Sequence, residues 1–122
     1  MSIVLIVEDN DKNMKLARDV LQAKGYQTVE AVTGEEGVKL AKEKKPDLVL
    51  MDIQLPGING IEAFRQIRAD AATRAIPVCA LTASVTPTDR SVINAAGFDA
   101  FLSKPINLKE FLDTVKRLVE KR

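Results

Sequence analysis

Several short apolar runs of this 122-residue chain end in polar side chains that could carry chemistry. These side chains are three acids, one hydroxyl and one ammonium: Glu8, Asp9, Asp52, Thr82 and Lys104. Parallel strands bring their carboxyl ends to one edge of a sheet, where open α/β folds place their ligand sites. If the apolar runs are parallel strands, the five side chains converge on a single polar site.

Three carboxylates brought together would repel one another and raise their pKa values. A hard divalent cation relieves that repulsion, and Mg2+ binds a few protein carboxylates together with water and phosphate oxygens. The set therefore predicts phosphoryl transfer, in which one carboxylate attacks phosphorus and forms a covalent intermediate. Lys104 would neutralise charge on the transferring oxygens, and Thr82 would donate a hydrogen bond to one of them.

Among the three acids, Asp52 is the predicted nucleophile. It ends the run Leu48–Asp52, whose four consecutive apolar residues are typical of a central strand covered on both faces. Such a strand holds its last side chain rigidly. Glu8 and Asp9 follow a second apolar run, Ile3–Val7. We expect Asp9 to be the main metal ligand and Glu8 to act through a water molecule.

The rest of the chain alternates between extended and helical patterns. Strands are predicted at residues 3–7, 27–32, 48–52, 77–82 and 99–102. Helices are predicted at residues 11–24, 34–45, 61–67, 87–97 and 108–119. The second strand is the most polar and is placed at a sheet edge. Five βα units in succession predict right-handed crossovers and a doubly wound parallel sheet with helices on both faces.

The composition excludes several classes of protein. Residues 1–122 form one expected domain with no linker and no separate output domain. With 46% hydrophobic and 29% charged residues, the chain is predicted to fold rather than to be disordered. The net charge of +1 gives no electrostatic basis for binding nucleic acid. No apolar run approaches the ~18 residues of a membrane helix. From the charge and the short apolar runs, respectively, we expect neither nucleic-acid binding nor membrane insertion.

The N-terminal sequence and the single cysteine lead us to expect a cytoplasmic protein. The N-terminus lacks the basic start and cleavage site of a signal peptide. Cys79 is the only cysteine, which rules out an internal disulfide and suits a reducing compartment. The chain has no histidine, so it cannot itself be a phosphohistidine donor.

Four stretches carry a resemblance to a known family. They are residues 4–10 (VLIVEDN), 50–56 (LMDIQLP), 80–83 (ALTA) and 102–105 (LSKP). In this order and at these strand ends, they resemble the bacterial response-regulator receiver domain of two-component systems. The resemblance implies the CheY-like, flavodoxin-like fold with strand order 2-1-3-4-5. Within the family, the chain resembles the single-domain DivK type and also receiver domains of hybrid kinases.

The resemblance implies a role for each residue of the site. Asp52 resembles the phosphoacceptor aspartate. Glu8 and Asp9 resemble the acid pair that holds Mg2+ (or Mn2+), together with Asp52 and the backbone carbonyl of Gln54. Lys104 resembles the lysine that pairs with the phosphoryl oxygens.

Further family positions lie around this set. Thr82 and Phe101 resemble the switch pair, in which the hydroxyl moves onto the phosphoryl group and the ring fills the space left behind. Pro105 follows Lys104 in a peptide bond that is usually cis. Gln54 and Ser84 stand two positions past Asp52 and Thr82, where family members tune dephosphorylation. Phe101 departs from the tyrosine of many members and has no ring hydroxyl.

The function that the resemblance implies is a phosphorylation-dependent signalling switch. A histidine kinase or a phosphotransfer protein would supply the phosphoryl group. The surface near Phe101 would then change and alter the binding of a downstream protein. Apart from catalysing its own phosphorylation and dephosphorylation, the chain is not expected to be an enzyme.

Two other functions fit the same alternation of strands and helices. An aspartyl-phosphate phosphatase commonly has a second acid two residues beyond the nucleophile, but Gln54 occupies that position here. A flavin or dinucleotide module would need a phosphate-binding loop, and no G-x-G-x-x-G follows the first strand. Turnover of a phosphate ester would favour the first alternative, and bound flavin colour would favour the second.

Overall fold

The computed structural model describes residues 2–83 and 87–120. Its strands are β1 (Ile3–Val7), β2 (Gln27–Ala31), β3 (Leu48–Asp52), β4 (Val78–Thr82) and β5 (Ala100–Ser103). Its helices are α1 (Asp11–Ala23), α2 (Gly34–Lys44), α3 (Gly60–Ala69), α4 (Pro87–Ala96) and α5 (Leu108–Glu120). Strands and helices alternate as the sequence predicts, and most bounds differ from the predicted ones by a residue or two.

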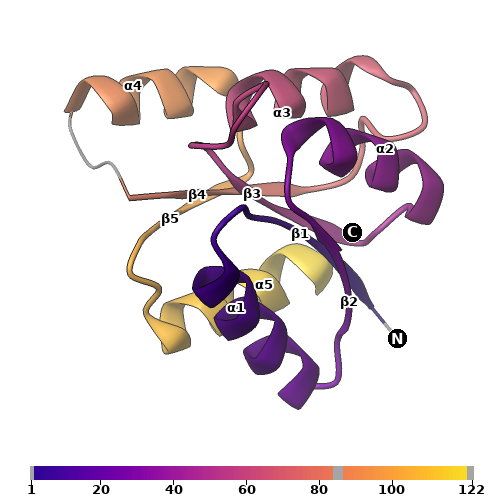
Figure 1. Ribbon diagram of the computed structural model, residues 1–122, viewed down its shortest axis with the longest axis vertical. Coiled ribbons are helices and arrows are strands. Elements are labelled where there is room, and N and C mark those ends of the chain that lie inside the picture. Colours follow the sequence, from indigo (N-terminus) through magenta and orange to yellow (C-terminus); the bar gives the residue numbers. More distant parts are fainter. Residues whose placement is uncertain (1, 84–86, 121–122) are drawn as a thin grey trace.

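The strands form a single parallel sheet in the order β2-β1-β3-β4-β5. Figure 1 shows α2, α3 and α4 on one face of this sheet and α1 and α5 on the other. This is the predicted doubly wound arrangement, with β3 at the centre and the polar β2 at one edge. The carboxyl ends of β1, β3, β4 and β5 therefore share one edge of the sheet.

The continuous apolar run of β3 is explained by burial on both of its faces. Leu48 and Leu50 pack in the core that includes side chains of α1 and α5. Val49 and Met51 pack in the second core, which includes side chains of α2 and α3. All four are completely buried, and each such side chain contributes roughly 1.5–3 kcal/mol of burial free energy. The strand is thereby fixed up to its last residue, Asp52.

The helices begin and end with recognisable signals. Thr33 precedes α2, and its side-chain oxygen accepts a hydrogen bond from the amide of Glu36 at 3.1 Å. This is the N-cap arrangement that short hydroxyl side chains favour. Gly25 follows α1 with a φ of +90°, which glycine adopts without steric strain. Among residues 2–83 and 87–120, no helix combines the length and apolarity needed to cross a membrane.

The burial of Cys79 predicts how slowly its thiol reacts in the folded chain. Its side chain on β4 is completely buried, and burial raises the pKa of the thiol to about 12. At pH 8 the thiol is therefore both protonated and inaccessible, and each condition suppresses its reaction, because the thiolate is the nucleophile. We expect a disulfide reagent to label the folded chain only as fast as the chain unfolds. Labelling at the rate of the denatured protein would contradict this packing.

Candidate functional site

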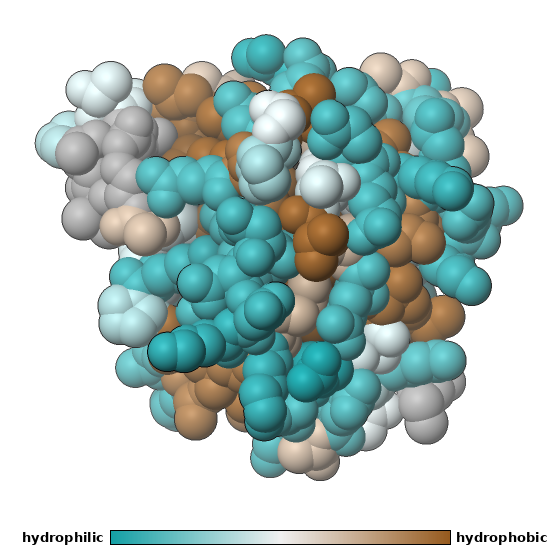
Figure 2. All heavy atoms as spheres, in the orientation of Figure 1, coloured by the Kyte–Doolittle hydropathy of each residue, from teal (hydrophilic) through white to brown (hydrophobic). Residues whose placement is uncertain are grey.

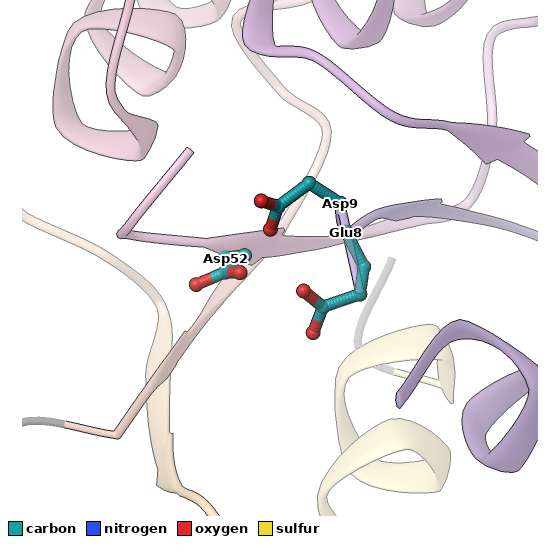
Figure 3. Close-up of side chains that lie close together, drawn as sticks. All are labelled: Glu8, Asp9 and Asp52. Carbon is teal, nitrogen blue, oxygen red and sulfur yellow. The ribbon is translucent and has the colours of Figure 1, made fainter. Parts of the chain in front are cut away.

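Three carboxylates meet at the carboxyl edge of the sheet. Asp52 is the last residue of β3, and Glu8 and Asp9 follow the end of β1. Figure 3 shows the three side chains turned toward one another from the two neighbouring strands. One oxygen of each lies within 4.8 Å of the corresponding oxygens of the other two. Glu8 and Asp52 are only 2% and 3% exposed, whereas Asp9 is exposed.

Lys104 directly follows β5, the far edge strand, and its side chain reaches this group. Its Nζ donates to Glu8 Oε1 at 2.6 Å and to Asp52 Oδ2 at 3.2 Å. The backbone amide of Lys104 donates to the carbonyl of Thr82 at 2.8 Å, which continues the pairing of β5 with β4. The Lys104–Pro105 peptide bond is cis. Lys104 thus connects β5 to the ends of β1 and β3.

The ammonium of Lys104 does not balance the negative charge of the three carboxylates. Burial and the hydrogen bond with Asp52 raise the pKa of Glu8 to about 7, although Lys104 acts in the opposite direction. Burial alone would lower the pKa of Lys104, but its bonds with Glu8 and Asp52 outweigh that effect and raise it. One ammonium therefore faces three carboxylates. This set of hard oxygen donors fits a divalent cation such as Mg2+.

The loop after β3 fixes the orientation of Asp52. The Oδ1 atom of Asp52 accepts a hydrogen bond from the backbone amide of Gln54 at 3.0 Å. Gly60, the first residue of α3, donates its amide to the carbonyl of Ile53 at 3.0 Å. A Cβ added to Gly60 would lie 2.1 Å from the carbonyl oxygen of Asp52. Because only glycine fits there, α3 can begin directly against the end of the strand.

The close approach of Gly60 to the end of β3 was not predicted from the sequence. The sequence feature that could have indicated it is the Asn59-Gly60 pair, in which a glycine directly follows the residue that caps a helix. The side chain of Asn59 accepts a hydrogen bond from the amide of Glu62 at 2.9 Å and caps α3. An Asn-Gly pair at this point therefore marks both the helix cap and the contact with the strand.

The proposed switch residues lie on one face of the sheet. Thr82 ends β4 and is 1% exposed, while Phe101 on β5 is half-buried. In the register, Phe101 is opposite Ala80 and Thr82 is opposite Ser103. Because side chains alternate between faces, Thr82 and Phe101 point to the same side of the sheet. That side carries α2, α3 and α4 (Figure 1).

Of the two residues expected to tune dephosphorylation, the structure describes only Gln54. Gln54 is exposed and, with Thr82, lines a hollow of about 300 Å3 beside α4. Its position next to Asp52 leaves the side chain free of the core and close to the site. Ser84, the other residue, lies outside the residues that the structure describes.

The pairing of Lys104 predicts how the site responds to loss of that charge. In Lys104→Met, Glu8 and Asp52 lose their ammonium partner while the methylene stem is retained. Without divalent cation, we expect the free energy of unfolding to fall by ~1–3 kcal/mol, the cost of leaving buried polar groups unpaired. Mg2+ should recover much of this loss. Urea unfolding with and without Mg2+ measures both quantities, and a large loss of Mg2+ affinity in this variant would contradict the assignment.

Comparison with known proteins places this geometry in a family. Residues 4–116 match the family model described as the response regulator receiver domain. The chain belongs to this family. A receiver domain is a signalling switch rather than a classical enzyme, and the group of acids and lysine described above stands at its carboxyl sheet edge.

Individual relatives agree with this assignment. The polar-differentiation response regulator DivK of Brucella anthropi is 46% identical over 113 residues, covering 93% of this chain and 92% of that protein. The receiver domain of sensor histidine kinase PA1611 from Pseudomonas aeruginosa is 33% identical, with a TM-score of 0.91 over 98% of each chain. That structure has a magnesium ion coordinated in its active-site cleft.

A third similarity concerns the fold. A CheY-like receiver domain protein from Methanospirillum hungatei has a TM-score of 0.90, with 24% identity over 99% of this chain and 95% of that one. The strand order of the receiver domain described here is that of the CheY-like, flavodoxin-like fold. The predicted fold class and family are therefore confirmed.

Proposed function

We propose that this receiver domain accepts a phosphoryl group on Asp52. The observation that carries the proposal is the nearly buried Asp52 carboxylate, held by Gln54 and Lys104 beside two further acids. A carboxylate oxygen attacks phosphorus and forms a new P–O bond. The bond from phosphorus to the donor breaks, and its electron pair leaves with the donor. The product is an aspartyl phosphate.

The surrounding side chains serve this transfer in different ways. Glu8, Asp9, Asp52 and the backbone carbonyl of Gln54 would hold Mg2+ or Mn2+. The bound metal would offset negative charge on the phosphoryl oxygens. Lys104 places its ammonium beside Asp52, where it pairs with a phosphoryl oxygen, and the hydroxyl of Thr82 donates to another. In this sense the domain catalyses its own phosphorylation without being a turnover enzyme.

Phosphorylation would act by shifting a population between two states of the domain. Movement of the Thr82 hydroxyl onto the phosphoryl group frees space behind it, which the ring of Phe101 fills. Since Phe101 and Thr82 point to the same side of adjacent strands, one can respond to the other. Phe101 has no hydroxyl, so the altered surface around it is recognised by a downstream protein through shape.

The proposed phosphoryl donor is a histidine kinase or a phosphotransfer protein. Residues 1–122 contain no histidine, so the phosphohistidine lies outside this sequence. Such an exchange takes place in the cytoplasm, which also suits the unpaired Cys79. A domain of this kind needs no nucleic-acid contact for the transfer, and its net charge of +1 supplies no electrostatic attraction to one.

Labelling from acetyl phosphate tests the proposal without a cognate kinase. With Mg2+, we expect the bound phosphate to rise to at most one phosphoryl group per chain. Removal of Mg2+ with a chelator should prevent uptake. Hydrolysis of a phosphate ester over many cycles would instead show a phosphatase, and the absence of any Mg2+-dependent adduct would refute phosphoacceptance.

A further inference from the structure

One contact beside the switch pair has no part in the phosphoryl chemistry. The guanidinium of Arg90, on α4, lies over the ring of Phe101 with its central carbon 5.4 Å from the ring centroid. A cation within about 6 Å of an aromatic face is attracted by the negative charge of that face. Because Phe101 lacks a hydroxyl, its ring can be held on this side only through its faces and edges. Arg90 therefore contacts the one ring that the proposed switch moves.

The helix that carries Arg90 is lightly attached to the sheet. Among the described side chains of α4, only Ile93 is buried, and Val92 is 48% exposed. A hollow of about 160 Å3, lined by Arg90, Asn94 and Phe101, lies on the β5 side of the helix. The hollow of about 300 Å3 that Gln54 lines also reaches Val92 and Ile93. Figure 2 shows hydrophobic surface beside α4, at the upper left.

These observations have a common consequence for α4. A helix with one buried anchor and open space on two sides has few apolar contacts to hold it, which is typical of elements with low local stability. A single additional contact then accounts for a sizeable share of its attachment. The stack of Arg90 on Phe101 is such a contact, and it joins α4 to β5 through the ring.

We propose that Arg90 is a positioning residue of the switch. Its guanidinium stabilises Phe101 in the half-buried position and holds α4 against β5, so it opposes the inward movement of the ring. Phosphorylation must overcome this stack before the surface can change. This inference rests on the proposed function, since it assigns Arg90 a role in the response to a phosphoryl group on Asp52.

The expected effect follows from the strength of an exposed cation–π contact. Loss of the contact should shift the balance between the two ring positions by ~2- to 5-fold toward the inward one. Any ligand that binds the inward state better gains the same factor in apparent affinity. Arg90→Met removes the charge and keeps a long side chain. Arg90→Lys keeps a cation, so it should retain part of the cation–π stabilisation of the Phe101 ring.

Beryllofluoride, a phosphoryl mimic, provides the test together with Mg2+. The chain is labelled with fluorophenylalanine, which marks its four phenylalanines, and the Phe101 resonance is assigned by Phe101→Leu. In Arg90→Met without beryllofluoride, this resonance should move part of the way toward its bound position. Beryllofluoride should bind ~2- to 5-fold more tightly than to the wild type. Arg65→Met, which removes an exposed arginine of α3, is the matched control and should change neither.

The outcomes separate the two proposals. If the wild type binds beryllofluoride but Arg90→Met leaves both the Phe101 resonance and the affinity unchanged, the role of Arg90 is refuted while the switch stands. The same holds if Arg65→Met has an equal effect, because net charge alone would then explain it. A wild type that binds no beryllofluoride would overturn the proposed function and, with it, this inference.

Discussion

Replacing Asp52 with Asn is expected to abolish labelling of the chain by acetyl phosphate. The amide has nearly the shape of the carboxylate, but its oxygen is not a nucleophile toward phosphorus. The variant should still fold, because the amide oxygen can accept the hydrogen bond that Gln54 donates to Asp52, and Lys104 keeps its hydrogen bond to Glu8. One like charge beside the buried Glu8 is also removed. A lost signal therefore reports lost chemistry rather than lost structure.

The measurement is the amount of acid-stable, base-labile phosphate bound per chain in the presence of Mg2+. Asp113→Asn, which changes an exposed acid of α5 in the same way, is the matched control and should be labelled like the wild type. Circular dichroism and urea unfolding check that both variants are folded. Undiminished labelling of Asp52→Asn would remove Asp52 from the role proposed for it.

Replacing Asp9 with Asn is expected to weaken Mg2+ binding by at least ~10-fold, since even changes in residues that only support a metal's ligands cost about 10- to 100-fold in affinity. Asp9 is exposed, so its loss should leave the stability of the metal-free domain nearly unchanged. Its carboxylate points toward Asp52 in Figure 3 and completes the oxygen cluster. Isothermal titration with Mg2+ measures the affinity directly.

Asp11→Asn is the matched control for this effect. Asp11 is also exposed and begins α1 two positions after Asp9, but it is not part of the carboxylate cluster. The two variants lose the same charge near the site, so a specific ligand role predicts a much larger loss for Asp9→Asn. Equal and small losses would mean that Asp9 contributes only to the local field.

The order of the elements could be predicted because burial leaves a direct mark on the sequence. The runs that become β1, β3 and β4 are covered on both faces, and their residues are apolar up to the polar residue that ends β3 and β4. The polar 27–32 run could be placed at the edge for the opposite reason. Once the strands were known to be parallel, the meeting of Glu8, Asp9 and Asp52 followed from topology alone.

Contacts between side chains of different elements could not be predicted in this way. The stack of Arg90 on Phe101 depends on where α4 settles over β5, and no sequence spacing specifies that placement. The close packing of Gly60 on Asp52 likewise depends on the path of the loop between them. The sequence predicted that Lys104 lies near Glu8 and Asp52. It did not predict that the ammonium donates one hydrogen bond to each of these acids.

The central claim is that Asp52, and no other acid of the cluster, carries the phosphoryl group. Borohydride reduces an aspartyl phosphate to homoserine, which marks the modified position permanently. After labelling with acetyl phosphate and reduction, peptide mass spectrometry should find homoserine at residue 52. Modification at Asp9 or Glu8 instead, with residue 52 still aspartate, would contradict the account.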